Sequence, residues 1–138
     1  MRASPEPLGG TALNNRLRYL LAFILILALE VGIALYVHDG FIRPYLGDML
    51  AVWGLYCLVR ACAGRDIPLL PLYVFLFAAA VECAQYLGLA RLLGLSQVPV
   101  LGALLGATFD VQDLLMYFTG CALLALGRWG LRRHGARR

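Results

Sequence analysis

Four long apolar segments constrain the fold of this chain more than any other feature of its sequence. They cover residues 17–37, 48–62, 69–89 and 111–129. About 20 helical residues, each rising 1.5 Å, cross a hydrocarbon core of about 30 Å. The chain is 62% hydrophobic and only 14% charged, whereas a soluble domain has roughly 25% charged residues. The segments therefore predict an all-α, polytopic membrane protein with four transmembrane helices.

The flanking regions suggest one domain with two tails. Residues 1–15 are polar and rich in Gly, Pro and Asn, so we expect a flexible cytoplasmic tail there. A single four-helix transmembrane domain is predicted over residues 16–130. Residues 131–138 are rich in arginine and are expected to form a basic cytoplasmic tail.

Breaks between the apolar segments predict the loops. Pro44 and Gly47 are expected to end any helix before the second span, and Asp48 to cap the N-terminus of that span. Pro68 and Pro71 suit the first turn of the third helix. Glycine and proline interrupt residues 90–109, which favours a short re-entrant or interfacial helix between helices 3 and 4.

The arginines predict the orientation of the bundle. Ten of the twelve fall on the side that holds both termini, and only Arg43 and Arg91 fall on the other. The positive-inside rule then places both termini in the cytoplasm. Because the arginines flank apolar segments instead of forming a basic face, we expect no nucleic-acid partner.

The acidic residues gather on the opposite side. An ionisable residue inside a membrane costs a few kcal/mol and is a functional-site hypothesis by default. Glu82 and Glu30 both lie about 10 Å below the outer ends of their helices. Glu82, Gln85 and Tyr86 share one helix face. Asp113, Tyr117 and Gly120 form a similar stripe on the last helix, and Gly120 removes bulk where another helix would pack.

We therefore predict one outward-facing polar pocket. Its candidate residues are Glu30, Arg43, Asp48, Glu82, Gln85, Arg91, Asp110, Asp113 and Tyr117. An alternative is that the acids only pair with Arg43, Arg91, His38 and the tyrosines and so lock the bundle together.

Other polar and reactive residues receive simpler interpretations. Asp39 and Asp66 are expected to be solvated loop acids. His38 has no second ligand at a typical spacing, so no metal and no cofactor is predicted. The four cysteines lie in or beside apolar spans without a CxxC spacing and are expected to act as small apolar residues.

Two passages resemble a known family: FIRPYLGDMLAVWGLYCLVR and ATFDVQDLLMYFTG, with VECAQ between them. They resemble a family of small bacterial integral membrane proteins of unknown function, which in turn resembles the VanZ-like proteins, named for a teicoplanin-resistance accessory protein. The resemblance covers about residues 17–127. Its most specific positions are Arg43, Gly47, Asp48, Tyr56, Arg60, Glu82, Gln85, Asp110, Asp113, Tyr117 and Gly120.

VanZ-like proteins share a glutamate on the penultimate helix and an acidic motif entering the last one, where this chain has Glu82 and Asp113. They commonly have Asn where this chain has Tyr117. The resemblance implies the four-helix fold, a bacterial cytoplasmic membrane and a role in the cell envelope.

Three functions remain open from the sequence. The first is binding or handling of an envelope lipid or its phosphate-bearing head group, with Arg43 and Arg91 on the phosphate and Glu82 or Asp113 as proton acceptor or hydrogen-bond partner. No serine or histidine is placed for a nucleophile–base pair, so we expect a protein that is not an enzyme. The second is a proton-coupled small transporter with Glu30 and Glu82 as relay, and the third is an assembly partner in a membrane complex.

Overall fold

The structure, a computed structural model, describes residues 8–94, 97–99 and 109–137 and is all-α over these ranges. The helices are α1 (Leu8–Tyr36), α2 (Ile42–Ala63), α3 (Leu70–Tyr86), the one-turn α4 (Leu89–Leu92) and α6 (Val111–Gly135). Three of them, α1, α2 and α6, are long and apolar enough to cross a membrane. The fourth long helix, α3, is apolar but has only 17 residues.

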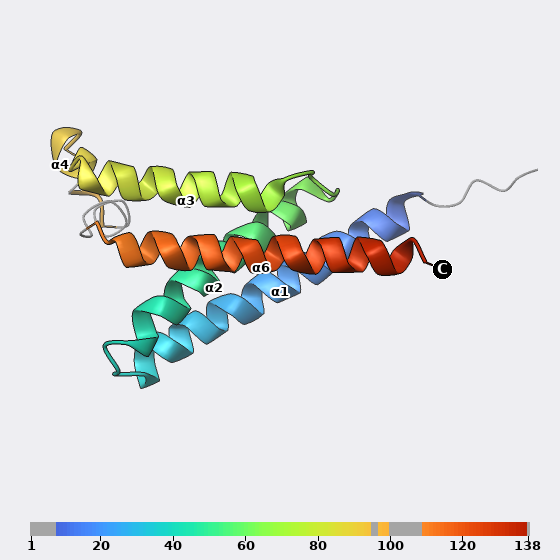
Figure 1. Cartoon of the computed structure of the whole chain (residues 1–138), viewed down its shortest axis with the longest axis horizontal. Helices are drawn as coiled ribbons and strands as arrows, with labels where there is room; N and C mark the ends of the chain where they lie inside the picture. The colour runs from blue at the N-terminus through green and yellow to red at the C-terminus, as the bar shows by residue number, and fades with distance from the viewer. Residues whose placement is uncertain (1–7, 95–96, 100–108, 138) are drawn as a thin grey trace, which may run out of the picture.

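The helices form two layers that cross at an angle (Figure 1). Helices α3 and α6 run side by side, and the α1–α2 hairpin crosses them and diverges from α6 at the end where α6 begins. Helix α2 contacts α1, α3 and α6, whereas the described part of α1 packs on α2 alone. Helices α2 and α6 are therefore the central pair that positions polar side chains.

A close approach joins the two central helices. A Cβ atom on Gly120 of α6 would lie 2.7 Å from Val52 Cγ2 and 3.2 Å from Met49 Cγ, both on α2. Trp53 Nε1 donates a hydrogen bond of 3.0 Å to the backbone oxygen of Gly120. Val52 and Cys121 are buried here, which confirms the expectation that Gly120 lies where another helix packs.

Helix α2 begins earlier than predicted. It starts at Ile42, so Pro44 lies in its first turn, where a proline removes no helical hydrogen bond. Asp48 is inside the helix, and the prediction that it caps the N-terminus is wrong.

The start of α1 was predicted wrongly, whereas the position of Pro71 at the start of α3 was predicted correctly. Helix α1 begins at Leu8 instead of Leu17, so residues 8–15 are helical. Pro71 does occupy the first turn of α3, as expected. Of the predicted re-entrant or interfacial segment over 90–109, the structure describes only part of α4 and a few residues beyond it, and the rest lies outside the described ranges.

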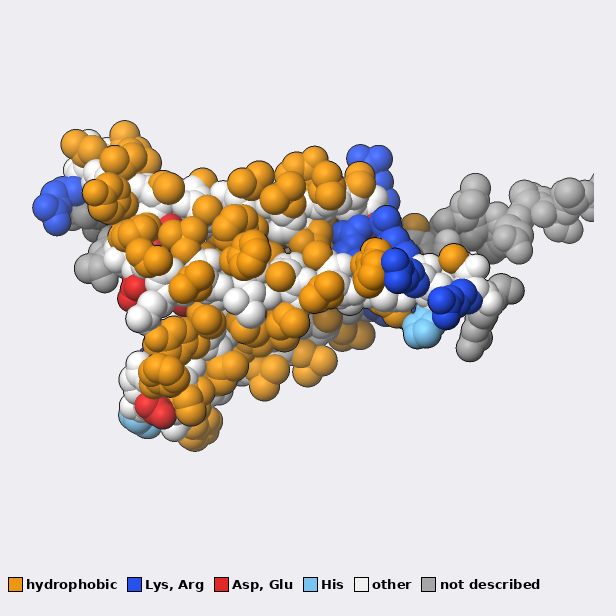
Figure 2. Space-filling model, in the orientation of Figure 1, with side chains coloured by type: hydrophobic (Ala, Val, Ile, Leu, Met, Phe, Trp, Pro, Cys, Tyr) orange, Lys and Arg blue, Asp and Glu red, His pale blue; other side chains and the backbone are white. Residues whose placement is uncertain are grey.

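Apolar side chains cover the length of the helices, and charged ones gather at the two ends (Figure 2). Leu25, Leu35, Leu76, Phe77 and Leu126 are each more than half exposed. Such a continuous apolar surface is typical of contact with lipid, not water. In this view acidic side chains lie near the end where α6 begins, and most arginines lie at the opposite end.

Candidate functional site: an acidic cluster at the start of the last helix

Four acidic residues from three helices form what we call the acidic cluster. Its members are Asp48 of α2, Glu82 of α3, and Asp110 and Asp113 at the start of α6. Asp110 is the N-cap of α6, and its Oδ1 accepts a hydrogen bond of 2.9 Å from the backbone N–H of Gln112. Asp113 follows in the first turn, where the positive end of the helix dipole favours a carboxylate.

Glu82 is the most deeply buried member, with 1% of its surface exposed. Tyr117 Oη donates a hydrogen bond of 3.2 Å to Glu82 Oε1. The backbone amide of Asp110 also approaches this carboxyl group. Its second oxygen, Oε2, is buried and has no hydrogen-bond partner among the described residues.

Asp48 lies against Asp113. Asp113, Glu82 and Asp110 all lie close enough to act on the Asp48 carboxyl group electrostatically. Asp48 Oδ2 is buried and, over the described ranges, has no hydrogen-bond partner. No arginine or histidine of the described chain forms an ion pair with any member of the acidic cluster. The cluster therefore gathers four acidic groups that have no basic partner among the described residues.

The structure brings together five of the nine predicted pocket residues, namely Asp48, Glu82, Asp110, Asp113 and Tyr117. Gln85 lies one turn after Glu82 on α3 and is half-buried. Glu30 lies apart from these residues, because it is on α1, which packs only on α2. Arg43 and Arg91 are exposed, and their side chains form no hydrogen bond or ion pair within the described ranges.

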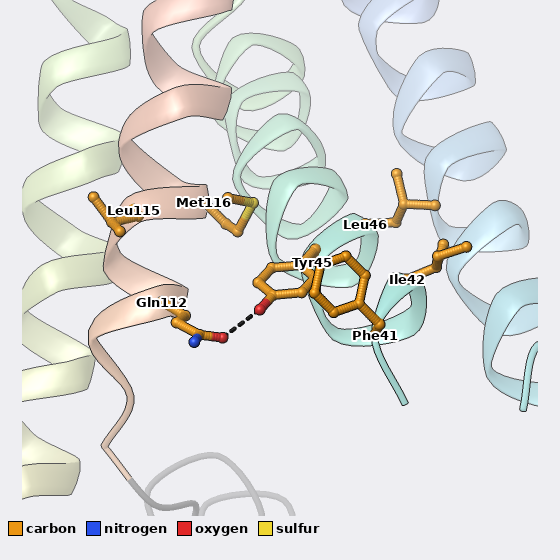
Figure 3. Close-up of a pocket in the computed structure, with 7 residues that line it drawn as sticks. All are labelled: Phe41, Ile42, Tyr45, Leu46, Gln112, Leu115 and Met116. Carbon is orange, nitrogen blue, oxygen red and sulfur yellow. Dashed lines mark hydrogen bonds between the residues drawn. The ribbon is translucent and has the colours of Figure 1, made fainter. Parts of the chain in front are cut away.

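An apolar groove lies between the beginnings of α2 and α6 (Figure 3). It has a volume of about 540 Å³. Its walls are Phe41, Ile42, Tyr45, Leu46, Gln112, Leu115 and Met116, from the beginnings of α2 and α6. Tyr45 Oη donates a hydrogen bond to Gln112 Oε1 across it. Because Gln112 precedes Asp113 and Tyr45 is one turn before Asp48, groove and cluster share the same end of the central helix pair.

Sequence analysis did not find this groove. Its walls come from segments 67 residues apart, and nothing in their local pattern marks them as neighbours.

The opposite end of the bundle holds a basic cluster, which we define as Arg60, Asp66, Arg128 and Arg132. Asp66 accepts from Arg60 Nη1 at 2.6 Å, from Arg128 Nη2 at 2.8 Å and from Arg132 Nη2 at 3.0 Å. Asp66 is half exposed, but it is not the simple solvated loop acid that we expected. It ties the loop after α2 to the end of α6.

No group of three or more His, Cys, Asp or Glu in the described chain has an arrangement that could hold a metal ion.

Comparison with known proteins identifies the family. A family model described as "Protein of unknown function (DUF2809)" matches residues 37–121, more than half of the chain. The chain belongs to this family. The DUF2809 segment contains the whole acidic cluster, Tyr117 and every wall residue of the apolar groove. Glu30 lies outside it. No curated protein and no solved structure matches the chain.

Proposed function

We propose that this protein binds the head group of a membrane lipid, with a cationic amine of that head group held by the acidic cluster. One observation carries the proposal: Glu82 Oε2 is buried among other carboxylates and has no hydrogen-bond partner in the described chain. A buried acceptor without a donor costs about 1–3 kcal/mol, and more when it is charged. A ligand that supplies donors and positive charge would recover that free energy.

The chemistry of the cluster favours an ammonium group. An ammonium carries three N–H donors and no acceptor, whereas Tyr117 supplies a single hydroxyl donor to Glu82. Asp48 and Asp113 face the same region and offer further acceptor oxygens. Hydrogen bonds between an ammonium and carboxylates are roughly twice as strong as neutral ones. A phosphate alone would be repelled by these four acids.

The neighbouring groove favours a lipid over a free amine. Its volume of about 540 Å³ lies within the range of about 300–1,000 Å³ that is usual for ligand pockets. Apolar side chains form most of its walls, so an acyl segment fits it. Arg43 and Arg91 are both exposed. We propose that they bind the phosphate of the same head group at the membrane surface, which is the role expected for them from the sequence.

The membrane setting is part of the proposal. We take α3 as a fourth crossing, both termini as cytoplasmic and the acidic cluster as facing outward. This arrangement is supported by the ten-to-two division of the arginines. The resemblance to VanZ-like proteins supports a bacterial inner membrane and a role in the cell envelope.

The contact between Asp48 and Asp113 favours a second candidate, a proton-coupled small transporter. Two neighbouring carboxyl groups that interact electrostatically can share one proton. A relay would also need polar groups deeper in the bundle. Below the cluster the central helices contribute Val52, Tyr56, Cys57 and Cys121 to the buried core, and no acidic or basic side chain of the described residues is buried with them. Lipid binding is therefore the better supported of the two.

Lipid binding is tested on the full chain in nanodiscs of equal parts phosphatidylethanolamine and phosphatidylcholine, followed by native mass spectrometry of the bound lipid. The quaternary ammonium of phosphatidylcholine carries no N–H donor. We expect phosphatidylethanolamine to be retained preferentially. In Glu82→Gln this preference should fall at least about tenfold, because a charge-assisted hydrogen bond is lost.

The matched control is Asp39→Asn, which removes one exposed acid at the same end of the bundle. It should keep the wild-type preference. An equal loss in both variants, or no preference in the wild type, would contradict the proposal. The transporter would be favoured by two results together. Sealed vesicles with the wild-type protein would take up protons and those with Asp113→Asn would not, and the wild type would show no lipid preference.

A further inference from the structure

We propose that the basic end of the bundle binds the phosphate of an anionic phospholipid, in a pocket between the start of α3 and the end of α6. This site is separate from the acidic cluster and does not depend on the function proposed for it. The pocket has a volume of about 220 Å³. Leu69, Pro71, Ala125 and Trp129 form apolar walls, and Arg128 and Arg132 supply positive charge.

The basic cluster has more positive than negative charge. Three guanidinium groups converge on one carboxylate: Oδ1 of Asp66 accepts from Arg60 and Arg128, and Oδ2 accepts from Arg132. No other acid in the described chain forms an ion pair with these arginines. Two positive charges therefore remain, and an anion would balance them.

Unused hydrogen-bond donors lie at the same place. A guanidinium carries five N–H donors. Arg128 uses Nη2 for Asp66 and for the backbone oxygen of Ile67, but its Nη1 is buried and has no hydrogen-bond partner among the residues that the structure describes. Arg132 is 65% exposed and gives only one described hydrogen bond. Planar guanidinium groups match the oxygen geometry of a phosphate.

The apolar walls favour a lipid phosphate over free phosphate. Leu69 is 64% exposed and Trp129 is 54% exposed, so both present apolar surface beside the arginines. Arg133 lies 3.6 Å from the centroid of the Trp129 ring and stacks on it. Basic pockets between transmembrane helices recognise lipid head groups in this way.

The backbone of Leu69 gives a second indication of a ligand site. It has φ 58°, in the left-handed region that a bulky residue rarely adopts. Such strain persists only where the surroundings enforce it, and it clusters at ligand sites.

The test uses the full-length protein, freed of lipid in a neutral detergent and titrated with short-chain phosphatidylglycerol or phosphatidylcholine. Native mass spectrometry counts the bound lipid. We expect phosphatidylglycerol to bind more tightly, and Arg132→Gln to weaken it about tenfold through the loss of a charge-assisted hydrogen bond. Arg137→Gln, which removes the same charge further along the chain, should leave binding unchanged.

A second variant separates the two sources of phosphate. Ala125→Trp should obstruct the apolar wall without changing charge, so it should weaken phosphatidylglycerol binding and leave binding of inorganic phosphate unchanged. Equal weakening by Arg132→Gln and Arg137→Gln would indicate nonspecific attraction and overturn the proposal. The assignment to a lipid would be overturned if inorganic phosphate displaced phosphatidylglycerol at equal concentration and Ala125→Trp did not weaken phosphatidylglycerol binding.

Discussion

At the scale of single residues, the partner of Glu82 decides how the acidic cluster is interpreted. Tyr117 Oη donates to this carboxylate, and no arginine of the described chain pairs with it. A buried ion pair would have explained Glu82 as a structural residue. A carboxylate that receives one phenolic hydrogen bond while its other oxygen lacks a partner among the described residues is better explained by a ligand.

Tyr117→Phe tests this hydrogen bond. Removing the hydroxyl should lower the free energy of unfolding by about 1–3 kcal/mol, because the buried carboxylate loses its side-chain donor. In a Glu82→Gln background, Tyr117→Phe should lower the free energy of unfolding by less, because a buried neutral amide depends less on the Tyr117 hydroxyl than a buried carboxylate does. Unfolding of the lipid-free protein in mixed detergent, analysed as a double-mutant cycle, measures the coupling. Tyr73→Phe changes an exposed tyrosine of α3 and should be neutral; full additivity in the cycle would contradict a direct contact.

Asp66 is a second residue whose contacts have a measurable consequence. Three arginines from α2 and α6 converge on it. Exposed ion pairs are worth about 0–1 kcal/mol each, so Asp66→Asn should lower the free energy of unfolding by about 1–2 kcal/mol. The loss should shrink at high salt, because screening weakens the original interaction. Asp39→Asn, an exposed acid outside any ion pair in the described chain, is the control; equal effects of the two would contradict a role for the cluster.

The candidate residues could be predicted from the sequence because an acid in an apolar segment is conspicuous. Glu82 and Asp113 were selected for that reason, and Tyr117 because its spacing places it on the same helix face as Asp113; the three do lie together. Their partners could not be predicted, because pairing depends on which faces of different helices meet. Glu30 was expected at the same depth as Glu82, but its helix packs on α2 alone and not on α3 or α6. Asp66 follows Arg65 in a short loop, and only the fold brings Arg128 and Arg132 to it.

At the scale of helices, the crossing of α2 and α6 depends on one glycine. Val52, Met49 and Trp53 of α2 occupy the space that a side chain at position 120 would need. The start of α2 was predicted too late along the chain, because Pro44 is compatible with the first turn of a helix as well as with a loop. The apolar pattern identified the helix but could not distinguish these two positions for the proline.

Gly120→Ala should therefore destabilise the protein by about 1–3 kcal/mol, because overpacking forces the neighbouring side chains to move. Gly127→Ala on the same helix is the matched control, since its Cβ would meet no atom within 4 Å. Alanine also has the higher helix propensity, by up to about 1 kcal/mol, so this control should be neutral or stabilising. Thermal unfolding in detergent measures both variants, and equal stability of the two would show that the contact with Val52 is not restrictive.

At the scale of the whole molecule, the length of α3 is the point on which the topology depends. Its 17 residues extend about 25 Å at 1.5 Å per residue, slightly less than the hydrocarbon core. Helix α6 beside it has 25 residues and exceeds that thickness. If α3 crosses, the described residues beyond it lie on the same side as the α1–α2 loop.

Single cysteines in a background without the native four test this arrangement. Gly40→Cys and Arg91→Cys should react with an impermeant thiol reagent in intact cells, whereas Arg65→Cys and Ala136→Cys should react only after lysis. Gly40 and Arg91 are exposed, so lack of labelling would reflect sidedness. Labelling of Arg91→Cys together with Arg65→Cys would mean that α3 does not cross the membrane.

The hydrogen bond between Tyr117 and Glu82 also bears on how the protein is made. Helix α3 leaves the ribosome before α6. Under the proposed four-crossing arrangement, Glu82 therefore enters the membrane before Tyr117, its described side-chain donor, has been synthesised. During that interval an apolar helix carries a carboxylate that costs a few kcal/mol in lipid. Docking of α6 then completes the site and retains α3 in the bundle. Insertion of α3 should therefore be the step of biogenesis most sensitive to loss of the last helix.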